Sequence, residues 1–110
     1  MIEMIVFKNE DDTIRGFQLS GHADSGPQGH DLVCAAVSAV SFGAVNAIIS
    51  IVGCTPDIEQ GDEGGFLKMN LPEGLTGVAF QKAQTLLMGM IVTFETIEND
   101  YSEYITISRT

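Results

Sequence analysis

Residues 31–53 read DLVCAAVSAVSFGAVNAIISIVG, and this apolar stretch decides how the rest of the chain folds. From Leu32 to Val52, 16 of 21 residues are apolar, a length that could cross a bilayer. Polar residues interrupt the run, and acidic residues flank it in place of the Lys or Arg that anchors a membrane span. Asp31 is a suitable N-cap and Gly53 a suitable helix stop. We therefore expect a helix that is buried on nearly all sides inside a soluble domain.

Shorter β-rich and amphipathic segments flank this helix. The predicted order is strand, strand, helix, strand, strand, helix, strand, over Ile2–Lys8, Thr13–Ser20, the apolar helix, Thr55–Gln60, Phe66–Leu71, Leu75–Glu98 and Tyr101–Ser108. Hairpins that alternate with helices indicate an α+β fold with a mostly antiparallel sheet and two helices packed on one face. We expect the apolar helix to lie between the sheet and the second helix, or against a partner subunit. The second helix is expected to turn these polar side chains to solvent: Gln81, Lys82, Gln84, Glu95 and Glu98.

The composition limits what the chain can do. With 110 residues, of which 45% are hydrophobic, it can form one domain with its own core, spanning residues 1–110. The 15 acidic and 5 basic side chains give a net charge of −10, which excludes nucleic-acid binding through a basic patch and favours basic partners. The N-terminal run reaches Lys8 too early for a secretory signal, and the two cysteines form no C-x-x-C motif. We therefore expect a cytoplasmic protein.

Cys34 is the candidate nucleophile. If Asp31 caps the helix, Cys34 is the third helical residue, where unpaired backbone N–H groups and the helix dipole favour a thiolate. His22 follows the second strand, at the far end of the glycine-rich segment Gly21–His30, for which we expect an irregular, mobile structure. Because that segment joins the strand end to the helix start, His22 can approach Cys34. A thiol, an imidazole and a nearby carboxylate are the components of nucleophilic catalysis.

The same residues allow other interpretations. A cysteine in an alanine-rich helix is often a small buried hydrophobe, and Asp31 has a sufficient role as a cap. His30 is also near Cys34, and local physics does not choose between it and His22 as a base. A metal site is a further alternative, with the ligand set His22, Asp24, His30, Asp31 and Cys34. Cys54 lies about 30 Å along the helix from Cys34, beyond the limit of about 7 Å for a disulfide, so we interpret it as structural.

The region around these residues resembles the signature of the ribosomal-processing cysteine proteases, the Prp family. The resemblance rests on Gly21-His22-Ala23 and on residues 29–38, GHDLVCAAVS, and it continues through Phe42-Gly43 and residues 46–48, NAI. It covers the length and the element order of the whole chain. It is most specific from Gly21 to Ile48.

The resemblance implies a cytoplasmic cysteine endopeptidase of bacteria, built as one domain over residues 1–110. That family removes a short N-terminal extension from large-subunit ribosomal protein twenty-seven, cutting after a Phe-Phe pair and before a small residue. The resemblance assigns Cys34 as the nucleophile and His22 as the general base, with Asp31 as an orienting or merely capping residue. It also implies a homodimer and a substrate loop that contains Gly21, Gly26 and Gly29. A thiol nucleophile needs no metal or organic cofactor, and the acidic flanks of the apolar run favour no membrane partner.

Two other classes of protein stay open at this point. One is a non-enzymatic ribosome-assembly module in which Cys34 belongs to the core. The other is a thiol-redox or metal-binding protein that uses the same His, Asp and Cys side chains. The acidic charge fits an encounter with the N-terminal peptide of a basic ribosomal protein, whatever the chemistry that follows.

Overall fold

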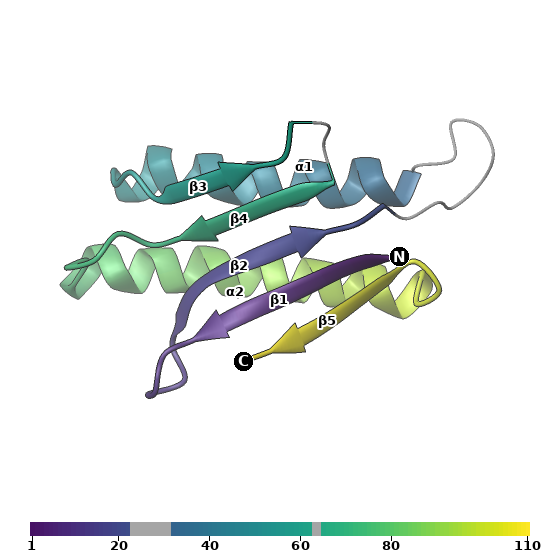
Figure 1. Cartoon of the computed structure of the whole chain (residues 1–110). Coiled ribbons are helices and arrows are strands. Elements are labelled where there is room, and N and C mark those ends of the chain that lie inside the picture. Colours follow the sequence, from purple (N-terminus) through teal and green to yellow (C-terminus); the bar gives the residue numbers. More distant parts are fainter. Residues whose placement is uncertain (23–31, 63–64) are drawn as a thin grey trace.

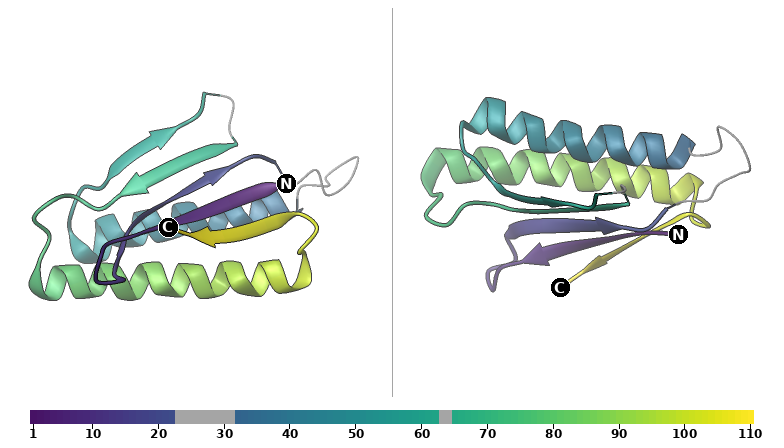
Figure 2. Two further views of the ribbon diagram at one scale, coloured as in Figure 1. Left: turned by 60° about the horizontal axis from the view of Figure 1, so that its bottom comes forward. Right: turned by 45° about the horizontal axis from the view of Figure 1, so that its top comes forward.

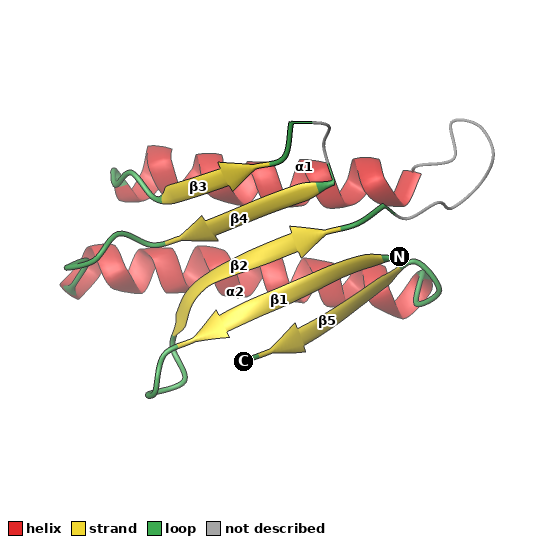
Figure 3. Cartoon of the chain, viewed as in Figure 1, coloured by secondary structure: helices red, strands yellow, loops and turns green. Residues whose placement is uncertain are grey.

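The computed structural model describes residues 1–22, 32–62 and 65–110, and within these ranges the chain forms two layers. One layer is a five-stranded sheet in the order β3-β4-β2-β1-β5, and both helices lie on one face of it (Figure 1). The predicted α+β class and element order are confirmed (Figure 3). The elements are β1 (Ile2–Lys8), β2 (Ile14–Ser20), α1 (Leu32–Ala47) with the π-helical turn η1 (Ile48–Val52), β3 (Asp57–Gln60), β4 (Phe66–Asn70), α2 (Gly77–Asp100) and β5 (Ile105–Arg109).

Strand β2 lies at the centre of the sheet. It pairs antiparallel with β1, where Val6 is opposite Phe17, and antiparallel with β4, where Leu19 is opposite Leu67. Strand β3 forms one edge by antiparallel pairing with β4, and β5 forms the other edge by running parallel to β1. Alternate residues of β1 are buried, as the period of a strand requires when only one sheet face is covered.

The core lies between the sheet and the helix layer. Phe17 of β2 and Phe94 of α2 are both fully buried in it. Each buried side chain of this size stabilises the fold by about 1.5–3 kcal/mol relative to an exposed one. The buried residues of α2 recur at helical spacing, as the sequence predicts: Ala83, Leu87, Met90, Ile91 and Phe94.

Helix α1 is less enclosed than the sequence predicts. It lies beside α2 on the sheet, and the two helices run in opposite directions (Figure 2), so α1 is not sandwiched between the sheet and α2. One stripe of α1 is buried: Val33, Val37, Ser41 and Val45. Its other faces, with those of η1, expose large apolar side chains: Leu32, Phe42, Ile49 and Ile51. The prediction of burial on nearly all sides is therefore wrong. In a two-layer fold the sheet covers one side of α1, α2 covers part of a second side, and the remaining sides are open.

The segment formed by α1 and η1 is strongly apolar although part of its surface is exposed. By length and composition alone, the 21 residues Leu32–Val52, with a mean hydropathy of 2.1, could cross a membrane. Core helices of soluble proteins that are mostly buried pass the same test. Here 28% of the most apolar part is buried, and the buried stripe of α1 packs on the core of the domain. The helix ends at Gly53 as predicted, where φ is 78° and the N–H donates to the carbonyl of Ile48 at 3.3 Å.

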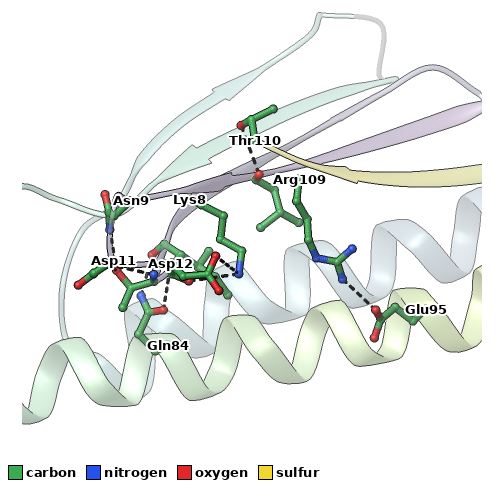
Figure 4. Close-up of polar contacts among 11 residues, drawn as sticks. Lys8, Asn9, Asp11, Asp12, Gln84, Glu95, Arg109 and Thr110 are labelled. Carbon is green, nitrogen blue, oxygen red and sulfur yellow. Dashed lines mark hydrogen bonds and ion pairs between the residues drawn. The ribbon is translucent and has the colours of Figure 1, made fainter.

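Two polar side chains of α2 that the sequence assigns to solvent instead bind strand backbone. Gln84 Oε1 accepts a hydrogen bond from the N–H of Ile14 at 2.8 Å, and Gln84 Nε2 donates to the carbonyl of Ile14 at 2.6 Å (Figure 4). Glu98 Oε2 accepts from the N–H of Ile107 at 3.1 Å. These partly buried contacts attach α2 to β2 and β5. The prediction that Gln84 and Glu98 face solvent is therefore wrong.

Candidate active site

The end of β2 and the first turn of α1 meet at one end of the sheet (Figure 1). A cavity of about 230 Å³ lies there, and both His22 and Cys34 line it. Gly21, which precedes the histidine, lines the same cavity. The fold thus brings together the two side chains that the sequence singles out for chemistry.

Cys34 is the third residue of α1 and is partly buried. In the first turn of a helix the backbone N–H groups have no partner within the helix, and the positive end of its dipole lies there, so both attract negative charge. Cys54 lies beyond the other end of the helix, partly buried against the core. No disulfide joins Cys54 to Cys34, as the geometric argument from the sequence requires.

The backbone around His22 is held by its neighbours. The Met1 nitrogen donates a hydrogen bond to the carbonyl of His22 at 2.6 Å. The N–H of Gly21, just after β2, donates to the carbonyl of Gly65, just before β4, at 2.8 Å. The imidazole itself lies against Gly65, since a Cβ built at that position would be 2.6 Å from Nε2 of His22. The backbone of Gly21 and His22 is therefore hydrogen-bonded to two other segments, although the histidine itself is exposed.

The rest of the cavity is apolar or neutral. Apolar side chains line most of it: Ile2, Leu19, Val37, Phe42, Phe66 and Leu67. Neutral polar side chains complete the lining: Ser20, Ser38, Ser41 and Gln60. No Lys, Arg, Asp or Glu occurs among the described residues at this surface. An uncharged, largely apolar segment of a ligand therefore suits the cavity better than a charged one.

Several lining residues were missed by the sequence reasoning. Ser38, Ser41 and Phe42 follow Cys34 by four, seven and eight positions, so they share its face of α1. That helical spacing is a signal that could have identified them. Gly65 comes from the turn before β4, and nothing in the sequence connects it with His22.

Other residues predicted for the site lie outside the described ranges: Asp24, Gly26, Gly29, His30 and Asp31. The capping role of Asp31 and the alternative of His30 as base stay predictions. Within residues 1–22, 32–62 and 65–110, no three His, Cys, Asp or Glu side chains gather closely enough to hold a metal ion.

Comparison with known proteins identifies the family. A family model for the cysteine protease Prp matches residues 1–106. The ribosomal processing cysteine protease Prp of Bacillus subtilis strain 168 is 44% identical over 108 residues, covering 98% of this chain and 96% of the relative. Two structures of the ribosomal processing protease Prp from S. aureus each match over 100% of both chains. One holds a covalently linked product peptide (TM-score 0.89, 37% identity) and the other a substrate peptide (TM-score 0.85, 36% identity). This chain therefore belongs to the cysteine protease Prp family and is a cysteine protease, as its sequence motif indicated.

Proposed function

We propose that this cysteine protease removes the short N-terminal extension of bacterial large-subunit ribosomal protein twenty-seven, cutting after a Phe-Phe pair and before a small residue. The observation that carries the proposal is the cavity that His22 and Cys34 line together. Two relatives support this proposal. The one from B. subtilis is a ribosomal processing protease, and the one from S. aureus binds substrate and product peptides.

The proposed chemistry is acyl transfer through a thioester. Cys34 gives its thiol proton to His22, and Sγ attacks the carbonyl carbon of the scissile bond. The imidazolium then protonates the departing nitrogen as the C–N bond breaks, which leaves the new C-terminus on Sγ. A water molecule next gives a proton to His22 and attacks the thioester, the C–S bond breaks, and the proton returns to sulfur.

The first turn of α1 supplies groups that can stabilise the negative oxygen of each tetrahedral intermediate. Cys34 lies in this turn, whose backbone N–H groups form the positive end of the helix dipole. Fixed donors of this kind, aimed at developing charge, are a major source of rate enhancement in acyl transfer. Asp31, if it caps the helix, would hold this turn in place.

The lining of the cavity supports the preference for a Phe-Phe pair. Two phenylalanines line it together with aliphatic side chains, Phe42 from α1 and Phe66 from β4. Aromatic side chains pair favourably edge to face, by about 0.5–1.5 kcal/mol beyond the area they bury. A carboxylate or an ammonium group would find no Lys, Arg, Asp or Glu partner among the described lining residues.

The charge of the protein supports a basic partner. Acidic residues lie on β3 and its following turn, in the segment that also supplies the lining residues Gln60 and Gly61: Asp57, Glu59 and Asp62. Ribosomal proteins are basic, so this edge and the net charge of −10 favour their encounter, most strongly at low salt.

The proposal is tested with a peptide that contains a Phe-Phe-Ala junction, with the products identified by mass spectrometry. We expect cleavage after the second Phe. Cys34→Ala and His22→Ala should reduce the product to background, because each removes one partner of the proton transfer. Cys54→Ser is the matched control and should cleave normally. Equal cleavage by Cys34→Ala contradicts the nucleophile, and equal cleavage of an Ala-Ala-Ala peptide contradicts the specificity.

We also propose that the protein is a cytoplasmic homodimer that pairs through its helix layer. Large apolar side chains are exposed there, among them Val78 (66%) and Val92 (59%). A hollow of about 410 Å³ lies between η1 and α2, lined in part by Ile51, Val78 and Leu86. Exposed apolar patches of this kind mark interfaces in soluble proteins. Sedimentation should give twice the mass of 11.8 kDa for the wild type and a monomer for Val78→Asp. A wild-type monomer that instead sediments with lipid vesicles contradicts both claims.

A further inference from the structure

The imidazole of His22 lies where another residue would have a side chain. A Cβ built on Gly65 would be 2.6 Å from Nε2 of His22, 3.0 Å from Cε1 and 3.3 Å from Cδ2. Ordinary contact with a Cβ begins at 3.4 Å, so any larger residue at position 65 forces the ring edge to move by about 0.8 Å. Gly65 thus sets how close to the start of β4 the ring can lie.

Gly65 is itself fixed by the sheet. Ser20 pairs with Phe66 in the ladder between β2 and β4, and at the next position the N–H of Gly21 donates to the carbonyl of Gly65 at 2.8 Å. Its φ of +73° lies in the left-handed region that favours glycine. The ladder holds this backbone, whereas the ring of His22 can turn about two side-chain torsions. A methyl group at position 65 therefore displaces the ring before it displaces the strand.

We propose that Gly65 is a positioning residue for His22, an assignment that rests on the proposed role of His22 as the base. By carrying no side chain, it leaves room for the imidazole in the cavity that His22, Cys34 and Gly65 line together. Proton transfer between the two side chains requires a separation of about 2.6–3.2 Å, and a displacement of about 1 Å can reduce the rate about 100-fold.

The test compares Gly65→Ala with Gly74→Ala. Gly74 has a similar φ of +81°, but a Cβ there has no other atom within 4 Å. Both variants therefore carry the same left-handed strain, and only Gly65→Ala meets His22. We expect Gly65→Ala to lower kcat about 100-fold with little change in KM. Its rate of Cys34 alkylation as a function of pH, measured in a Cys54→Ser background, should approach that of His22→Ala. Gly74→Ala should keep the wild-type kcat and pH profile.

A double-mutant cycle on the unfolding temperature tests the contact without using activity. In the His22→Ala background the ring is absent, so Gly65→Ala should there cost no more stability than Gly74→Ala does. A larger cost that persists in that background places the clash elsewhere and overturns the proposal. Equal kcat for Gly65→Ala and Gly74→Ala overturns it as well. His22→Ala is assayed before the glycine variants. Normal cleavage by that variant refutes the proposed base and is thereby distinguished from a failure of the proposal for Gly65.

Discussion

Replacing Gln84 with Leu should destabilise the protein strongly without touching the active site. The substitution keeps the size of the side chain and removes both hydrogen bonds to Ile14, at 2.8 and 2.6 Å. These bonds lie where the register of β1 and β2 shifts between Phe7 and Lys8. A partly buried backbone group that loses its partner costs about 1–3 kcal/mol, so two such groups, with some access of water, should cost about 2–4 kcal/mol.

The size of the effect on the melting temperature follows from the chain length. Unfolding entropy is about 2.1 cal/mol/K per residue, which gives about 230 cal/mol/K for 110 residues. Each kcal/mol therefore lowers Tm by about 4 °C, and Gln84→Leu should lower it by about 9–17 °C. Thermal unfolding followed by circular dichroism measures this shift. Asn99→Leu, an exposed position near the end of α2, is the control and should change Tm by no more than about 2 °C.

The same variant separates stability from catalysis. Ile14 begins β2, whereas His22 follows the other end of that strand, so the cleavage rate at 25 °C should stay close to that of the wild type. A loss of less than about 0.5 kcal/mol, the ordinary range for surface substitutions, would refute the view that Gln84 replaces a strand partner for Ile14.

Three further predictions concern single positions. His30→Ala should retain much of the turnover that His22→Ala loses, and the reverse order in a cleavage assay would make His30 the base. Gly21→Val should lower Tm as well as kcat, because φ is +93° there and a Cβ would clash with the carbonyl oxygen of Met1; an unchanged melting curve contradicts this. Hydrogen bonds from the side chain and backbone of Thr13 lower the pKa of Asp11 below its usual 3.8, so this carboxylate stabilises the fold above that value, and the contribution is lost as the pH falls through the lowered pKa. Thr13→Val should raise the Asp11 pKa in an NMR titration, and an unchanged value removes the hydroxyl as its cause.

The parts of the fold that the sequence predicts are those that local patterns determine. The hairpin of β1 and β2 follows from two β-rich runs around a polar turn, and α2 follows from apolar residues at helical spacing. Cys34 was recognisable as a helix-start residue because Asp31 and the apolar run mark that start. Each of these inferences needs only residues within one or two turns of each other.

The parts that the sequence does not predict depend on contacts between distant segments. Gln84 has the polarity of a solvent-facing residue, and only the docking of α2 on β2 gives it a backbone partner 70 positions away. The contact of the His22 ring with Gly65 likewise depends on the pairing of β2 with β4. The apolar sequence of α1 does not show which of its faces pack in the core of the domain. A buried face and a face available to a partner have the same composition.

The parallel pairing of β5 with β1 affects how the protein folds while it is being made. Ile2 pairs with Ile105 and Val6 with Arg109, so this edge joins residues about 100 positions apart. A nascent chain cannot close the sheet until residues near 109 have left the ribosome, and contacts of such long range slow folding. Until then only the edge of β1 that faces β2 is paired. The other edge has unpaired backbone groups, which can cause aggregation. The interval before β5 emerges is thus the one in which this protease most needs protection.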